Sequence, residues 1–531
     1  MSRLPEAMAR PAEADAEPGS PSPPSPSRTY LLGVLLAVAT AVVLRLAGLR
    51  NLQAEIYGDI AIVRKYLDFI RHGDWPRHFE LSSGPLYHYL VMPVIALAGP
   101  GYFGMKLASV AVSLGVLAAT FAVGRRLGGE TLALLSLFVA GVSSWLLIFS
   151  RLGNSQIVVP LLATTSLWLL VRFVQERRRR HLVLSAAVAA LGLYGYPQSF
   201  ILAPVMAATL LGLRATGLPV RWKDIALFAV TSLVVALPFA FIVRRDPANF
   251  FTGYIGGKIH SPGGIVRPLL ENGEKVVLSL HVRGDSVFRS NPSGRPHLDV
   301  VSGVLFLLGV AFWLRRERRR WSPAIFLPFV LQHVPSLLVL RAGAEVPSAS
   351  RTLGAAPEAY LLVASGVVLL LDLAARFRGA RPVLAVLLLG SVLALNVHRY
   401  LFEYLPGLPY DNTPIAALVS SYVNDLPPAT DVYLVGCCWK DGMPEPKGIE
   451  FGLDRPERLH RLEPGETSCA ALSRLRAPAV LIWDFSTPLP GPGLAPCAAW
   501  LPAQLYLSPR GRPVFFAAPL RVTRPPSPAS S

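Results

Sequence analysis

The sequence predicts an all-α polytopic membrane protein with a small α/β domain at its C-terminus. Of its 531 residues, 52% are hydrophobic and only 16% are charged, and the mean hydropathy is +0.45. An average soluble domain is far less apolar and more highly charged. Apolar runs of spanning length recur over residues 30–398, and short strand-like runs between Pro and Gly turns follow them. Membrane residence is therefore the first expectation.

Eleven apolar segments are each near the ~17 to 25 residues that a helix needs to cross a bilayer. The first, 30–49, is interpreted as an anchor, because no small-residue cleavage motif follows it. The segment 85–97 is short and carries His88 and Pro93, so we expect an interfacial or re-entrant helix there. The other expected spans are 102–124, 131–149, 155–174, 182–196, 199–213, 225–243, 299–314, 322–340, 356–375 and 382–398.

The positions of Lys and Arg support this number of spans, because short basic loops stay cytoplasmic. With a cytoplasmic N-terminus, eleven spans place every strong basic cluster inside except Arg244 and Arg245, which open a long loop where the rule weakens. The residues before the first span are rich in Pro, Ser, Ala and Glu, a composition typical of disorder. We expect a disordered cytoplasmic tail at 1–29, a transmembrane domain at 30–399, outer loops at 50–101 and 244–298, and an extracytoplasmic domain at 400–531.

The formal net charge of +18 does not indicate nucleic-acid binding, because the basic residues form short clusters between apolar runs. The four cysteines lie near the C-terminus without zinc-ligand spacing, so we interpret them as disulfide cysteines of a small domain in an oxidising compartment. We expect the adjacent pair to bond with the two later cysteines rather than with each other, since a vicinal ring is strained. These residues are Cys437, Cys438, Cys469 and Cys497.

Two acids in the first outer loop are candidate catalytic residues. Glu55 and Asp59 are four residues apart, which puts both carboxylates on one face if the segment is helical. Acids next to a membrane are costly and favour a functional interpretation. A carboxylate here would act as general base toward an acceptor hydroxyl, or would bind a divalent cation such as Mg or Mn that neutralises a phosphate. The alternative is a pair of solvated loop acids that form ion pairs with Arg64 or Lys65.

Short motifs in a fixed order cover about residues 50 to 375. Tyr57-Gly58-Asp59 and Gly84-Pro85-Leu86-Tyr87 lie in the first outer loop, and Arg283-Gly284-Asp285 and Arg351-Thr352-Leu353-Gly354 follow later. This ordered set resembles the GT-C superfamily. More narrowly, it is similar to glycosyltransferase family 39-like bacterial proteins, which are related to protein O-mannosyltransferases and to the aminoarabinose transferase of lipid A. That family usually has an Asp-Glu pair in the first loop, whereas Ile60 follows Asp59 here.

The resemblance implies a GT-C-like core of transmembrane and juxtamembrane helices that transfers a hexosyl or pentosyl group. The donor would be a polyprenyl-phosphate-linked sugar, and the acceptor an unidentified extracytoplasmic protein, lipid or glycan. The protein would then lie among membrane lipids in a bacterial inner membrane, with its active site on the periplasmic face, and act in cell-envelope glycosylation. Asp59 matches the family's catalytic acid, and Glu55 is the candidate for the missing second carboxylate.

The resemblance also implies that basic residues at the outer membrane surface hold the carrier phosphate. Arg151 and Arg351 lie at the outer ends of expected spans, where a guanidinium would grip phosphate with paired hydrogen bonds. The alternative for both is snorkelling toward water. Arg283, in a matching segment, is a further candidate. Tyr87 and His88 would contact the sugar or acceptor, or serve as interfacial anchors.

Two other classes of protein compete with this interpretation. A transporter or lipid flippase would have ionisable residues inside its spans and internal repeats at matching positions, and the sequence has few of the former and no repeat. A non-catalytic scaffold that keeps the GT-C fold is the second competitor. The absence of the family Glu at Ile60 favours it.

Overall fold

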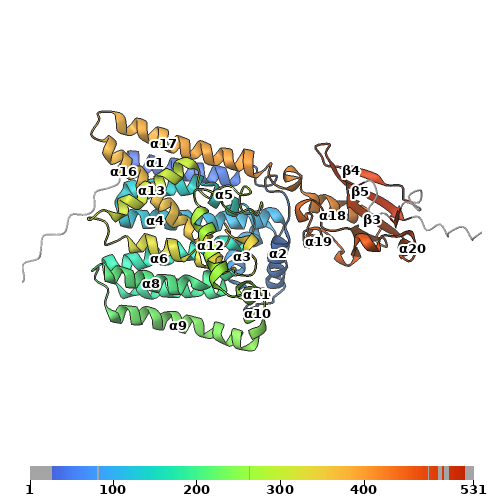
Figure 1. Cartoon of the computed structure of the whole chain (residues 1–531), viewed down its shortest axis with the longest axis horizontal. Coiled ribbons are helices and arrows are strands. Elements are labelled where there is room, and N and C mark those ends of the chain that lie inside the picture. The colour runs from blue at the N-terminus through green and yellow to red at the C-terminus, as the bar shows by residue number, and fades with distance from the viewer. Residues whose placement is uncertain are drawn as a thin grey trace, which may run out of the picture.

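The computed structural model describes residues 27–79, 83–261, 263–475, 478–487, 493–494 and 501–520. A bundle of long helices forms the larger body, and a smaller mixed domain covers one of its ends (Figure 1). Most of the predicted tail, residues 1–26, lies outside the described residues, and the first helix begins at Arg28.

Within the described residues, seven helices are long and apolar enough to cross a membrane. Three further apolar helices are shorter, and α7 (Arg179–Ala190) is shorter still. Each expected span has a helix at its place, but the total of eleven crossings stays a prediction. The seven are α1 (Arg28–Leu46), α4 (Tyr102–Val142), α6 (Val158–Glu176), α8 (Leu202–Ala215), α9 (Trp222–Arg245), α16 (Ala356–Ala374) and α17 (Ala380–His398), and the shorter three are α3 (Leu86–Ala98), α13 (Val300–Leu314) and α14 (Pro323–Leu331) with α15 (Val334–Leu337).

Helix α4 is a hairpin that supplies two of the expected spans, 102–124 and 131–149. Its backbone reverses at Gly129, where φ is 74° and ψ is −162°, a conformation that favours glycine. A Cβ at Gly124 would lie 2.6 Å from Ser136 Oγ and 3.1 Å from Ala133 Cα, so the two arms pack closely. The short helix α5 (Ser144–Ser150) continues the second arm.

Helices α13 and α16 pack closely against each other at the centre of the bundle, with glycines at their contact. A Cβ at Gly309 would lie 1.9 Å from the carbonyl oxygen of Leu362, and one at Gly366 would lie 2.0 Å from that of Leu305. Small residues at such contacts let helices pack in lipid, where the hydrophobic effect does not drive association. In the most apolar window of α16, 89% of residues are buried, against 11% in α9 and in α17, so these two outer helices present their apolar side chains to lipid.

The basic loops between helices gather at the end of the bundle far from the C-terminal domain (Figure 1). Arg126 pairs with Glu176 at 2.8 Å, and Arg177 pairs with Asp224 at 2.9 Å. Arg320 donates to the carbonyl oxygen of Gly217 at 2.6 Å. Loops that are far apart in sequence therefore share one end, as the charge pattern requires.

Four short helices lie near the end of the bundle that faces the C-terminal domain. In Figure 1, α2 (dark blue) lies between the bundle and this domain, with α10 and α11 below it. These helices belong to the two expected outer loops. Their bounds are Gly58–Arg71 for α2, Pro247–Phe251 for α10, Tyr254–Ile259 for α11 and Val266–Leu278 for α12.

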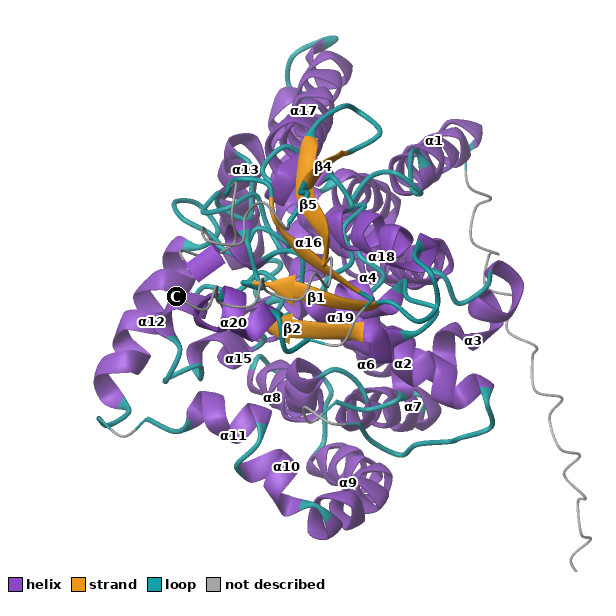
Figure 2. Ribbon diagram, turned by 90° about the vertical axis from the view of Figure 1, so that its right-hand side faces the viewer, coloured by secondary structure: helices purple, strands orange, loops and turns teal. Residues whose placement is uncertain are grey.

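The C-terminal domain is built on a five-stranded mixed sheet, which confirms the expected α/β character (Figure 2). The strand order is β2-β1-β3-β5-β4; β1 runs parallel to β2 and β3, and the other pairs are antiparallel. Helices α18 and α19 lie between this sheet and the helix bundle (Figure 1). The bounds are Asp431–Val435 for β1, Leu459–Leu462 for β2, Ala479–Asp484 for β3, Gln504–Leu507 for β4, Pro513–Leu520 for β5, Ile415–Asp425 for α18, Pro446–Phe451 for α19 and Cys469–Leu472 for α20.

The cysteines pair differently from our expectation. Cys437 is bonded to its neighbour Cys438, so the prediction that a vicinal bond would be avoided is wrong. Both residues follow β1 in an irregular segment, where the backbone is not held by the sheet. Cys469 is also disulfide-bonded, and Cys497 lies outside the described residues.

Candidate active site

A polar cavity of about 340 Å³ lies where the first outer loop, the 279–299 segment and the 341–352 loop meet. It brings together two of the predicted site residues, Asp59 and Arg351, which are far apart in the sequence. The other Asp, Glu, Lys and Arg residues that line it are Lys258, Asp285, Arg289 and Glu345.

Asp59 occupies the first turn of α2 and is exposed to the cavity. The buried face of this amphipathic helix includes Ile60, which is fully buried, together with Val63 and Leu67. The residue at the position of the family Glu is therefore a core residue that also contributes an apolar side chain to the wall of the polar cavity. The partial positive charge at the N-terminus of α2 favours a negative charge on Asp59.

Glu55 does not share a helix face with Asp59, so the predicted pair does not form. The helix begins at Gly58, and Glu55 lies in the irregular segment before it. Its side chain is buried, and its Oε1 accepts a hydrogen bond from the backbone of Ala416 in the C-terminal domain at 3.1 Å. Burial raises the pKa of Glu55 to about 8, so the carboxyl is mostly protonated at neutral pH.

Arg289 is a cavity residue that sequence reasoning missed. Its guanidinium pairs with Glu445 of the C-terminal domain at 2.9 Å and lies 5.9 Å from the ring centroid of Tyr57. Tyr404 donates a hydrogen bond to its carbonyl oxygen. Arg283, the predicted candidate in this segment, is exposed and does not line the cavity. Both arginines lie in the segment that carries the resemblance, and no spacing rule distinguishes them.

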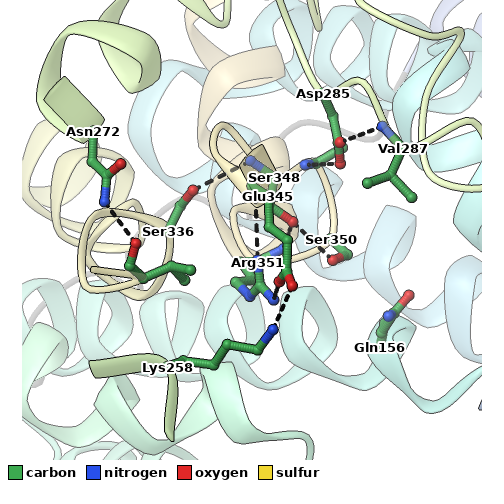
Figure 3. A network of polar contacts seen from close by, with 12 residues as sticks. Gln156, Lys258, Asn272, Asp285, Val287, Ser336, Glu345, Ser348, Ser350 and Arg351 are labelled. Carbon is green, nitrogen blue, oxygen red and sulfur yellow. Dashed lines mark hydrogen bonds and ion pairs between the residues drawn. The ribbon is translucent and has the colours of Figure 1, made fainter. Parts of the chain in front are cut away.

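Arg351 belongs to a network of charges on the other wall of the cavity (Figure 3). Its Nη2 contacts Glu345 Oε2 at 2.5 Å, and the other Glu345 oxygen pairs with Lys258. Burial raises the pKa of Glu345, but the hydrogen bonds from Lys258 and Arg351 outweigh this effect and hold the pKa below its usual value. Glu345 is therefore a carboxylate that orients two cations.

Asp285 joins two of the segments that form the cavity. Its carboxylate accepts backbone hydrogen bonds from Val287 and from Ala349, both at 2.8 Å (Figure 3). Burial raises the pKa of Asp285 to about 6. The bond to Ala349 fixes the loop that leads to Arg351.

Arg151 lies outside the cavity, although its sequence position resembles that of Arg351. Its side chain is buried and donates hydrogen bonds to the carbonyl oxygens of Leu44 at 2.6 Å, Arg45 at 3.1 Å and Ala47 at 2.8 Å. These are the unpaired carbonyls at the end of α1, so the guanidinium caps that helix. Arg151 therefore does not line the cavity that contains Asp59 and Arg351.

Tyr87 and His88 are both buried at the start of α3. The Tyr87 hydroxyl bonds to Ser109 at 2.9 Å, away from the cavity. His88 lines a side cavity of about 80 Å³ that also includes Asp59. Neither ring nitrogen of His88 has a hydrogen-bond partner among the described residues, although the residue is only 2% exposed.

An apolar pocket of about 160 Å³ adjoins the polar cavity. The two share Tyr196, Lys258 and Arg351. The remaining wall is formed largely by apolar side chains of the short helices and the bundle, namely Phe200, Ile201, Ile255, Ile259, Leu338 and Val339. The shared cations therefore stand where a polar space meets an apolar one.

The residues around Asp59 do not fit a divalent-cation site. Among the described residues, no group of three or more His, Cys, Asp or Glu side chains is close enough to hold a metal ion. Glu55, the expected second ligand, bonds to Ala416 instead.

Comparisons with known proteins agree with this architecture. Residues 82–242 match the family described as dolichyl-phosphate-mannose-protein mannosyltransferase. The apo structure of ArnT from Cupriavidus metallidurans aligns with a TM-score of 0.58 at 14% identity, covering 93% of this chain and 98% of that one. The chain has the GT-C fold. The ordered motifs therefore predict the fold correctly, and the family model matches part of the chain.

Two further structures share this GT-C fold. ArnT from the same organism bound to undecaprenyl phosphate aligns with a TM-score of 0.56 at 15% identity, covering 92% of this chain and 98% of that one. The apo oligosaccharyltransferase of Archaeoglobus fulgidus aligns at 0.50 and 14% identity, covering 92% and 74%. No match was found among proteins of curated function.

Proposed function

We propose that this GT-C protein transfers a sugar from a polyprenyl-phosphate donor to an acceptor hydroxyl. The observation that carries the proposal is the junction of the two cavities at Lys258 and Arg351. A charged head group fits the polar side, and the isoprene unit next to the phosphate fits the apolar side. Asp59 stands in the same polar cavity as a carboxylate base.

Lys258 and Arg351 are suited to hold the phosphate of the donor. Both are oriented by Glu345, so little side-chain freedom is lost when they bind a ligand. As the bond between the anomeric carbon and the phosphate oxygen breaks, the phosphate gains negative charge. Nearby cations stabilise that charge more strongly in the transition state than in the bound donor.

Asp59 completes the proposed reaction as general base. It removes the proton from the acceptor hydroxyl, and the oxygen attacks the anomeric carbon on the face opposite the phosphate. The new carbon–oxygen bond forms as the phosphate leaves, so the configuration inverts. The products are the glycosylated acceptor and polyprenyl phosphate, and the proton remains on Asp59 until it is released to water.

A donor-consumption assay tests this proposal. Purified protein in detergent is mixed with polyprenyl-phosphate sugars of several kinds and with a crude envelope extract as the source of acceptor. Release of polyprenyl phosphate that depends on the protein supports a transferase. Movement of donor across proteoliposomes without its consumption would instead indicate a flippase and overturn the proposal.

The cavity is proposed to face the extracytoplasmic side of a bacterial inner membrane. The basic loops at the opposite end of the bundle are the motive, since such loops stay cytoplasmic. Single cysteines at Arg178 and Glu450 should therefore react with an impermeant reagent at Glu450 only. Labelling at position 178 in intact cells would contradict the proposed orientation.

His88 is predicted to contact hydroxyl groups of the sugar or acceptor in the side cavity. Buried ring nitrogens without a hydrogen-bond partner among the described residues cost stability, so His88→Phe should raise the free energy of unfolding by about 1 kcal/mol or more. It should also lower the transfer rate about tenfold, which is roughly the value of one lost hydrogen bond.

The matched control for His88 is Tyr87→Phe, which removes the hydroxyl bonded to Ser109 and should lower stability without slowing transfer. Thermal unfolding and donor consumption measure both variants. A His88→Phe protein that is destabilised and fully active would contradict the predicted contact.

A further inference from the structure

Glu445 of the C-terminal domain joins this domain to two parts of the candidate site. One carboxylate oxygen accepts a hydrogen bond from the backbone N–H of Gly58 at 2.7 Å. The other pairs with Arg289 at 2.9 Å. Glu445 therefore contacts Gly58, the first residue of the helix that carries Asp59, and Arg289, a cation of the polar cavity.

The C-terminal domain and the segment before α2 pack closely around this contact. A Cβ at Gly58 would lie 2.2 Å from the Glu445 carboxylate, and one at Gly448 would lie 2.2 Å from the carbonyl oxygen of Ile56. Asn412 also accepts a hydrogen bond from the backbone of Ala54 at 2.9 Å. The domain is thus fitted onto the segment that leads into α2.

Glu445 also supplies what the start of α2 lacks. Tyr57 at the N-cap makes no side-chain capping bond. The first backbone N–H groups of a helix need partners, and a negative charge there is favourable. The cap comes from a residue hundreds of positions later in the chain.

Arg289 lies in the field of two carboxylates. Burial lowers the pKa of its guanidinium, but the negative charges of Asp59 and then of Glu445 outweigh burial and raise the pKa. Since Arg289 and Asp59 line the same cavity, Glu445 and Asp59 compete for one cation. A guanidinium drawn toward Glu445 leaves Asp59 less neutralised.

We propose that Glu445 is a positioning residue that keeps Asp59 basic by holding Arg289. The C-terminal domain thereby completes the active site with a second carboxylate, although Ile60 follows Asp59 in the sequence. This inference rests on the proposed function, because it takes Asp59 as the base of a transfer reaction.

The test is Glu445→Gln in the full chain. Gln keeps an oxygen for the Gly58 N–H but loses the charge, so Arg289 interacts with Asp59 alone. We expect kcat to fall about tenfold with an almost unchanged donor KM, because a weaker base slows proton transfer. The acid limb of the pH–rate profile should move to lower pH, because the negative charge of Glu445 is lost while the positive charge of Arg289 stays.

Two comparisons separate this role from a structural one. Glu450→Gln removes an exposed charge from α19, the helix that directly follows Glu445, and should leave the rate and the pH profile unchanged. In an Arg289→Gln background, Glu445→Gln should add little, because residues that act through one another are not additive. Thermal unfolding checks that each variant is folded.

The possible outcomes are distinct. A slower enzyme whose pH profile does not move, or losses that add fully in the double variant, would overturn the positioning role. An active wild type with an unaffected Glu445→Gln variant would overturn this inference alone. A wild type that consumes no donor would overturn the proposed function itself.

Discussion

Replacement of Asp59 by Asn should lower the rate of donor consumption by ~10² to 10⁴-fold, the usual contribution of a general base. Asn has the same size as Asp but does not accept a proton at neutral pH. Because Asp59 is exposed on the first turn of α2, the variant should still fold and elute as a single species in detergent. Steady-state kinetics at saturating donor measure the loss. Turnover like that of the wild type would remove Asp59 from the mechanism.

Glu55→Gln is the matched control for Asp59→Asn. The pKa of Glu55 is raised to about 8 by burial, so Gln reproduces the uncharged form present at pH 7. We expect near wild-type turnover there. A larger loss than that of Asp59→Asn would assign the catalytic role to Glu55.

Glu55→Gln should also change how the free energy of unfolding depends on pH. An unfolded Glu titrates near ~4.3, whereas folded Glu55 titrates near 8. Because the folded state holds the proton more tightly, its stabilising contribution is full below about pH 4 and is lost as the pH rises to about 8. Gln does not titrate, so unfolding of Glu55→Gln should depend less on pH over this interval.

The sequence predicts the positions of the apolar helices, and two of its candidate site residues line one cavity, while their roles stay predictions. Hydropathy reports the length of apolar helices directly, so even the two arms of α4 are separated at Gly129. Asp59 and Arg351 belong to motifs that resemble those of a known family, and such motifs carry spatial information that residue spacing alone lacks. The structure places both residues in one cavity.

The remaining site residues depend on contacts that local sequence does not encode. The helical spacing of Glu55 and Asp59 gives no sign that α2 starts only at Gly58. Arg151 binds carbonyl groups at the end of α1, a helix more than a hundred residues earlier in the chain. Glu445 comes from the C-terminal domain, for which the sequence offers no motif. These outcomes are decided by tertiary packing, so similar residue types at similar positions have different roles.

Replacement of Arg351 by Gln should mainly weaken donor binding. A charge-assisted contact with phosphate contributes ~1.5 to 3 kcal/mol, which corresponds to a roughly 10- to 150-fold higher dissociation constant. The donor affinity of Arg351→Lys should lie between those of the wild type and Arg351→Gln, since Lys keeps the charge but loses the paired geometry of the guanidinium. Neither should approach the loss in kcat expected for Asp59→Asn. Binding of polyprenyl phosphate can be followed by the rise in unfolding temperature with ligand concentration.

The control for Arg351 is Arg341→Gln, an exposed arginine at the start of the same loop that does not line the cavity. It removes the same charge and should leave the affinity unchanged. A general effect of net charge would weaken binding equally in both variants and would fall as salt is added. The phosphate contact instead predicts a loss specific to Arg351, because this residue and Lys258 stand at the junction with the apolar pocket. Unchanged affinity in Arg351→Gln would place the phosphate elsewhere in the cavity, with Lys258 and Arg289 as the other candidate cations.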